Sequence, residues 1–286
     1  MLLGATIVYG TSYVAARVTL QSVPPAMLAF LRLVIASAVL ASLPRRGRGQ
    51  PFSRADHQAV AWMGILGFAG AYVCSNWGIA HSTATNAALL ITVEPLAMIL
   101  LSPWYLGERL SGRAAVGATL TIVGAVVLVV NGIPGVTEKL APHWAGDMVL
   151  VVAGVAYASY SLRGRRVLQR HAPLEVTARS LAWGAAALAP VAGLEWAAGA
   201  RPSWTGTAVS GTLYLAVVIT ALGYAVWNWA LARVPAPRAA IFLNGQPIVG
   251  ALLGAMLLSE PITLFTVLGG VLLVTGLGVA LGPGAR

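Results

Sequence analysis

The chain has 286 residues, of which 58% are apolar and only 9% are charged, against roughly a quarter charged in an ordinary soluble domain. Eight acidic and eighteen basic side chains cannot cover a soluble protein of this length, so we expect lipid to surround most of the outer surface. The formal net charge of +10 would suggest nucleic-acid binding in a soluble protein. Here the basic residues fall between apolar runs, and we expect no nucleic-acid partner.

Ten apolar runs follow one another, and each approaches the roughly 20 residues that a membrane-spanning helix needs. They cover residues 2–22, 25–43, 58–80, 84–106, 112–132, 146–163, 173–198, 206–232, 237–258 and 261–282. They predict an all-α membrane protein with ten transmembrane helices. Counts of nine or eleven stay open, because one run is short and the run at 84–106 contains two prolines. The first run lacks a basic leader segment, so we expect a retained helix rather than a cleaved signal peptide.

The basic residues predict the orientation. If the N-terminus is cytoplasmic, the inside loops hold Arg45, Arg46, Arg48, Arg54, Arg109, Arg113, Arg163, Arg165, Arg166, Arg170, Arg233, Arg238 and Arg286, and the outside holds only Arg17, Lys139 and Arg201. Cytoplasmic loops carry an excess of Lys and Arg. We therefore expect both termini in the cytoplasm.

An internal repeat relates the two halves of the chain. A shift of 152 residues overlays 72–130 on 224–282 without a gap, with 16 identities in 59 pairs, among them Tyr, Asn, Trp, Pro and Glu. A weaker shift of 147 aligns Tyr13 with Tyr160 and Arg32 with Arg179. We predict five-helix repeats at 1–133 and 145–284. Because five is odd, the second repeat must be inverted, as in alternating-access transporters whose substrate site lies between the halves.

The repeat carries a paired signature. The segment LLSPWYLGERLS and its mate AMLLSEPITL each have a Pro thirteen residues before the Glu, and a Gly-rich helix follows each. In these features the chain resembles the EamA-type branch of the drug/metabolite transporter superfamily. The resemblance implies ten helices as two inverted repeats and export of metabolites, often amino acids or related compounds, across the bacterial inner membrane. This chain departs from the family pattern in having Tyr9-Gly10 for Trp-Gly, and its second repeat has Ser259 where Gly107 stands.

Glu94 is the main candidate for chemistry, because it lies near the middle of its predicted helix and charges in the bilayer core are costly. It is either a protonatable or substrate-facing carboxylate, or a side chain bonded to a neighbouring helix that fixes the kink at Pro95. Its repeat mate is Gln246.

Tyr72 and Asn76 share one helix face, and Tyr224 and Asn228 repeat that face in the second half. We expect these pairs and Glu94 to line a central cavity, with interhelical hydrogen bonds as the alternative for the Asn side chains. Further substrate-binding candidates are Tyr13, Tyr157, Tyr160, Asn244 and Gln246, although each tyrosine and Asn244 alone fits a structural role as well.

Other polar residues are expected to be structural. Arg32 and Arg179 can extend to the membrane surface or pair with loop carboxylates. Glu108 and Glu260 are expected to cap the helices that follow them. The four histidines show no metal-site spacing, and the single Cys74 excludes an internal disulfide.

The chain lacks the clusters that a membrane-embedded enzyme needs, with only Asp56 and Asp147 as aspartates and no GxSxG or HExxH motif. It also lacks a nucleotide-binding loop. We expect a secondary transporter with no cofactor and no metal, whose partners are a small-molecule substrate and the lipid bilayer, acting as a monomer or homodimer. An exporter of amino acids or related compounds is the leading hypothesis. A lipophilic-cation or drug exporter is the alternative, followed by a non-transport membrane protein.

Overall fold

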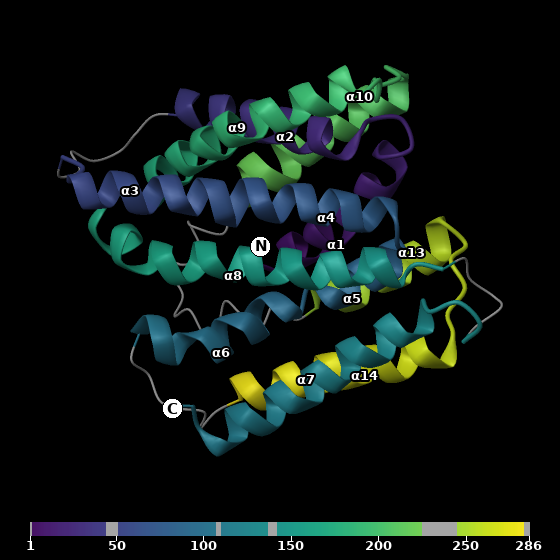
Figure 1. Cartoon of the computed structure of the whole chain (residues 1–286). Helices are drawn as coiled ribbons and strands as arrows, with labels where there is room; N and C mark the ends of the chain where they lie inside the picture. Colours follow the sequence, from purple (N-terminus) through teal and green to yellow (C-terminus); the bar gives the residue numbers. More distant parts are fainter. Residues whose placement is uncertain (1, 44–50, 107–109, 137–141, 225–244, 283–286) are drawn as a thin grey trace.

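The computed structural model describes residues 2–43, 51–106, 110–136, 142–224 and 245–282, and no strand occurs among them. The helices in chain order are α1 (Leu2–Thr19), α2 (Pro25–Ser42), α3 (Arg54–Trp62), η1 (Met63–Gly70), α4 (Ala71–Ala80), α5 (Ala84–Leu90), α6 (Val93–Leu106), α7 (Gly112–Asn131), α8 (Trp144–Arg170), α9 (Pro173–Ala197), α10 (Gly206–Leu213), η2 (Tyr214–Leu222), α13 (Gln246–Leu257) and α14 (Leu264–Leu281). They form one helical bundle (Figure 1).

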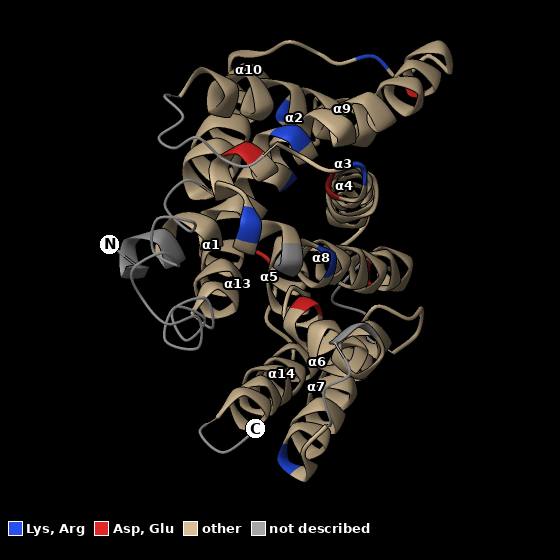
Figure 2. Ribbon diagram, turned by 90° about the vertical axis from the view of Figure 1, so that its left-hand side faces the viewer, with Lys and Arg blue, Asp and Glu red and all other residues tan. Residues whose placement is uncertain are grey.

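The composition of these helices suits a lipid environment. Within the described residues, six helical stretches are long and apolar enough to cross a membrane, namely Pro25–Ser42, Arg54–Ala80, Ala84–Trp104, Gly112–Asn131, Trp144–Gly164 and Leu264–Leu281. Gly206–Leu222 and Gln246–Leu257 are shorter apolar helices. Charged residues are sparse along the ribbons (Figure 2), and large apolar side chains such as Trp104 and Met256 are exposed. The protein is therefore an all-α, multi-pass membrane protein, whereas the count of ten spans stays a prediction.

Two predicted runs differ from the helices that form. The run at 84–106 divides into α5 and α6 around Ile91, because Pro95 has no N–H to donate to the Ile91 carbonyl. That carbonyl accepts instead from the Glu94 backbone N–H at 3.0 Å. The short run is the one at 146–163, and the helix that forms there is longer than the run, since α8 extends over Trp144–Arg170.

Helices α7 and α14, which the 152-residue shift relates, lie side by side in opposite directions (Figure 1). A Cβ on Gly124 would lie 2.8 Å from the Gly269 carbonyl, and a Cβ on Gly269 would lie 2.9 Å from the Gly124 carbonyl. Gly117 and Gly276 face each other in the same reciprocal way. Because Gly117 is the repeat mate of Gly269 and Gly124 that of Gly276, the contact is two-fold symmetric. This pair has the geometry that an inverted repeat requires.

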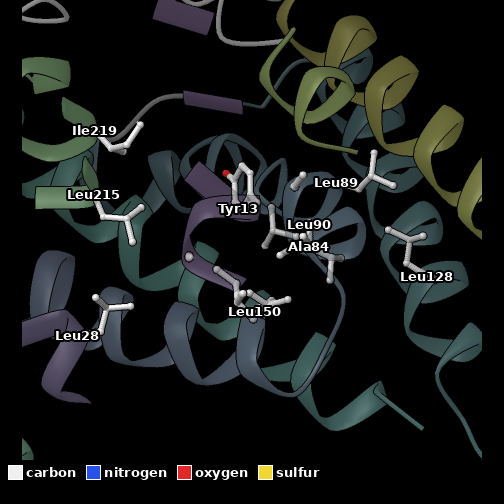
Figure 3. Packing of buried hydrophobic residues seen from close by; sticks show 14 of the residues in the cluster. Tyr13, Leu28, Ala84, Leu89, Leu90, Leu128, Leu150, Leu215 and Ile219 are labelled. Atoms are coloured by element: carbon white, nitrogen blue, oxygen red, sulfur yellow. The ribbon is translucent and has the colours of Figure 1, made fainter. Parts of the chain in front are cut away.

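The remaining helices pack in cross-repeat pairs, with α2 against α9, α4 against α8 and α1 against α13. Buried apolar side chains fill the space between them (Figure 3). Leu28, Leu90, Leu150 and Leu215 come from four different parts of the chain and are nearly or fully inaccessible. Lipid tails are as apolar as leucine, so these contacts hold the helices together by close packing rather than by removal from water.

Two π-helical segments interrupt the bundle at equivalent positions of the repeat. The segment η1 ends at Gly70 and η2 ends at Leu222, so each ends two residues before the paired tyrosines Tyr72 and Tyr224. Under the shift of 152 residues, η1 overlays 215–222. Wider π turns re-aim side chains and often occur at functional sites.

Candidate substrate cavity

A cavity of about 310 Å³ lies between the two halves of the chain. Its lining comes from α1, α2, α4, α6, α8, η2, α13 and α14. Seven residues predicted from the sequence line it, namely Tyr13, Tyr72, Glu94, Tyr157, Tyr160, Tyr224 and Gln246. The bundle therefore brings together side chains that are up to 233 positions apart in the chain, as the Tyr13–Gln246 hydrogen bond illustrates.

Asn76 does not join this set, and its predicted cavity-lining role is corrected. Its side chain is buried, and its amide donates to the Pro25 carbonyl at 3.1 Å. This is the interhelical hydrogen bond that was the alternative interpretation, because Asn76 faces the start of α2. Asn228 and Asn244 lie outside the described residues.

Glu94 lies in the first turn of α6 and lines the cavity. Among the described residues, no side chain or backbone group forms a hydrogen bond or ion pair with its carboxylate, so nothing in that part of the chain supports a bracing role. Its repeat mate Gln246 is held differently, since the Gln246 amide donates to the Tyr13 hydroxyl at 2.9 Å. The two mates therefore differ both in charge and in bonding.

Aromatic rings form one wall of the cavity. The ring centroids of Tyr72 and Tyr157 are 5.6 Å apart, and those of Tyr160 and Tyr224 are 6.1 Å apart. Phe68 of η1, which no sequence pattern indicated, packs behind Tyr72, Tyr160 and Tyr224. Tilted and edge-to-face rings with hydroxyl tips present both apolar contact area and hydrogen-bonding groups to a ligand.

Arg32 is the second charged lining residue, so the expectation that it extends to the membrane surface or pairs with a loop carboxylate is wrong. It is 9% exposed, its Nε donates to the Thr220 hydroxyl at 2.7 Å, and its guanidinium lies 4.3 Å from the Tyr72 ring centroid. The only sequence signal was a charge inside an apolar run. Its mate Arg179 does fit the structural interpretation, since it pairs with Glu175 at 2.7 Å.

One end of the bundle, which holds the turns at 80–84, 197–206 and 257–264, is closed by hydrogen bonds between helices; we call it the capped end. Glu195 of α9 accepts from the first backbone N–H groups of α2. Arg17 of α1 donates to the last carbonyls of α4 at 2.7 and 2.6 Å. Glu260 accepts from the start of α5. Charges of these signs at these helix ends are stabilising.

The cavity reaches from the capped end to the opposite end of the bundle. Ala16 and Ile79 line it close to the capped end, and Leu281, the last residue of α14, lines it at the other.

A second polar cluster lies at the capped end. Asp147 is fully buried and accepts hydrogen bonds from Ser82, from Asn86 at 3.1 Å and from His143 at 2.8 Å. The serine contacts the aspartate rather than the histidine, so the order is not that of a nucleophilic triad. Within the described residues no group of three or more His, Cys, Asp and Glu side chains is arranged to hold a metal ion. The cluster joins α8 to the α4–α5 turn.

A helical bundle with an apolar outer surface and an internal cavity lined by aromatic and charged side chains is the architecture of a membrane transporter. The model of the EamA-like transporter family matches residues 1–130 and 144–282. The chain belongs to this family.

Named relatives agree with this assignment. A protein of Archaeoglobus fulgidus named "Uncharacterized transporter" is 27% identical over 94% of this chain and 93% of its own length. The "Probable terminal-alkyne amino-acid exporter" of Streptantibioticus cattleyicolor is 28% identical over 94% and 88%, respectively. The "Probable amino-acid metabolite efflux pump" of Escherichia coli is 27% identical over 95% and 90%. A solved crystal structure with 22% identity superposes with a TM-score of 0.64 over 98% of this chain and 94% of that chain, which supports the fold.

Proposed function

We propose that the protein is a secondary transporter that exports amino acids or related small metabolites across the bacterial inner membrane by alternating access. The observation that carries the proposal is Glu94, a carboxylate without a hydrogen-bond or ion-pair partner among the described residues, in a cavity of about 310 Å³ lined by tyrosines. A carboxylate is costly inside a membrane protein unless a ligand, proton or water satisfies it.

The size and lining of the cavity suit a small amphiphilic solute. Ligand cavities are typically about 300–1,000 Å³ and combine apolar walls with a few polar groups that fix orientation. The Glu94 carboxylate suits an amino group, and the tyrosine rings suit the apolar part of a metabolite. Two relatives, one named as a probable amino-acid exporter and one as a probable amino-acid metabolite efflux pump, lend further support.

The position of the capped end indicates which state of the alternating-access cycle the structure represents under this proposal. With both termini cytoplasmic, as the arginine distribution predicts, the capped end faces outward. We then expect the cavity to be accessible from the cytoplasm, with Glu195, Glu260 and Arg17 holding the outer end together. Export would require these caps to release while the opposite end closes.

The proposal is tested with the full-length protein reconstituted in liposomes. Uptake of a panel of amino acids, sugars and fluorescent cationic dyes is measured against empty liposomes, with and without a pH gradient. We expect transport of one or more neutral amino acids. Transport confined to dyes would favour the lipophilic-cation alternative, and transport of sugars alone would contradict the proposal.

A further inference from the structure

Arg32 carries a charge that nothing in the described part of the chain balances. Neither a carboxylate nor any other acidic group described lies within ion-pair distance of its guanidinium, although the side chain is 9% exposed. Its contacts are a neutral hydroxyl and an aromatic ring. A buried charge is strongly disfavoured unless it is paired or hydrogen-bonded. The described residues therefore leave the charge of Arg32 free to meet an anionic ligand in the cavity.

The guanidinium is held so that one edge remains for that partner. Thr220 is fully buried in η2, and its hydroxyl donates to the Leu215 carbonyl at 2.9 Å while it accepts from Arg32 Nε at 2.7 Å. Tyr72 covers one face of the guanidinium. The two terminal NH₂ groups have no hydrogen-bond partner among the described residues, and Arg32 lines the cavity. Two parallel N–H groups match the two oxygens of a carboxylate.

Glu94 supplies the opposite charge in the same cavity. The two side chains form no ion pair with each other, yet both line the same cavity as Tyr9, Tyr13 and Tyr157. Opposite charges kept apart in one cavity, each without an ionic partner among the described residues, match a ligand that carries both charges itself.

We propose that Arg32 and Glu94 are the two poles of one binding site for a zwitterionic amino acid, with the substrate carboxylate on Arg32 and the substrate ammonium group on Glu94. Thr220 is a positioning residue that orients the guanidinium. This inference rests on the proposed function and narrows its substrate class. It separates a zwitterion from a lipophilic cation, because Arg32 repels the cation and leaves its own charge unpaired.

The first arm of the test uses the wild-type protein in liposomes and measures uptake of radiolabelled L-leucine. Two competitors each lack one charge: leucinamide has no carboxylate, and 4-methylpentanoate has no amino group. Unlabelled leucine is expected to compete at least about tenfold better than either, because a hydrogen bond to a charged group contributes roughly ten- to hundredfold in affinity. Equal competition by leucinamide would overturn the role of Arg32 without any variant.

The second arm tests which residue recognises which charged group of the substrate. Arg32→Gln is expected to lower the preference for leucine over leucinamide toward one, and Glu94→Gln is expected to do the same for leucine over 4-methylpentanoate. Thr220→Val is expected to weaken the leucinamide discrimination partially. Arg179→Gln is the matched control, because Arg179 pairs with Glu175 outside the cavity, and its preferences should equal those of the wild type.

The outcomes separate the two proposals. If the wild type transports leucine but Arg32→Gln retains full discrimination, the zwitterion site is wrong and amino-acid export stands. If Arg32→Gln does not fold, the competitor series on the wild type still tests whether binding requires both the carboxylate and the amino group of the substrate. If no amino acid of the wider panel is transported, the proposed function itself fails, and the zwitterion site fails with it.

Discussion

Glu260 caps helix α5 at Thr85 rather than the helix that follows Glu260 in the chain. Its two carboxylate oxygens accept from the backbone N–H groups of Ala84 and Thr85 at 2.7 and 2.8 Å, and the Thr85 hydroxyl donates at 2.6 Å. The prediction that Glu260 caps the following helix is therefore wrong. That helix, α14, is capped by Thr263 with Thr266. The carboxylate instead links the second half of the chain to α5 of the first.

Glu260→Ala is expected to lower the free energy of unfolding by about 1–2 kcal/mol, because it leaves two backbone N–H groups of α5 without an acceptor. Thermal unfolding in detergent measures this change. Glu175→Ala is the control, since the Glu175–Arg179 pair is partly exposed and such pairs contribute at most about 1 kcal/mol. An equally small effect of both substitutions would contradict a capping role for Glu260.

Gly124→Val is expected to destabilise the protein by roughly 2 kcal/mol or more, because the new Cβ would meet backbone atoms of α14 at 2.8 Å and the helices would have to separate. The melting temperature of the purified protein reports the loss. Gly278→Ala on α14 is the matched control, because no atom lies within 4 Å of its added Cβ. That variant should be neutral or slightly stabilised.

Ser259→Gly is expected to stabilise the protein by roughly 1 kcal/mol. Ser259 has φ of 51°, a left-handed conformation that costs a non-glycine residue about 1–2 kcal/mol. The repeat mate of Ser259 is Gly107, so the other half carries the residue type that suits such a turn. Ser259→Ala should give no such gain. A melting temperature of Ser259→Gly at or below that of the wild type would contradict strain at this turn.

Glu94→Gln is expected to flatten the pH dependence of transport between about pH 5.5 and about pH 8.5, the range that a buried carboxylate can reach. Tyrosine and arginine side chains, the other ionisable types that line the cavity, ordinarily titrate at about pH 10 or above. Transport at each pH is measured beside a melting curve. A fully active variant with an unchanged pH profile would remove Glu94 from the mechanism, and a loss of stability with an unchanged profile would assign it to bracing Pro95.

A fusion at Arg286 tests the predicted orientation. The arginine-rich loops predict cytoplasmic termini, so a reporter that fluoresces only in the cytoplasm should be bright there. An enzyme that is active only in the periplasm, fused at the same residue, should be inactive. The reverse pattern would invert the orientation and assign the capped end to the cytoplasm.

Patterns that recur along the chain predicted much of the fold. Apolar runs of spanning length and the scarcity of charge required a multi-pass helical protein, because lipid tolerates only helices or closed barrels. The 152-residue shift paired Gly117 with Gly269, and these glycines do lie on the two helices that cross with two-fold symmetry. The cavity positions of Tyr72 and Glu94 followed from the cost of polar groups in the bilayer core.

Other features depend on contacts between distant segments, and only the tertiary structure decided them. Arg32 and Arg179 are equivalent in sequence, yet Thr220 and Tyr72 hold Arg32 in the cavity, whereas Glu175 holds Arg179 outside it. Asn76, which was predicted to line the cavity, instead donates a hydrogen bond to the Pro25 carbonyl. A buried polar side chain takes whichever partner the packing brings within about 3 Å. That partner comes from another helix, and the spacing of residues along one helix does not specify it.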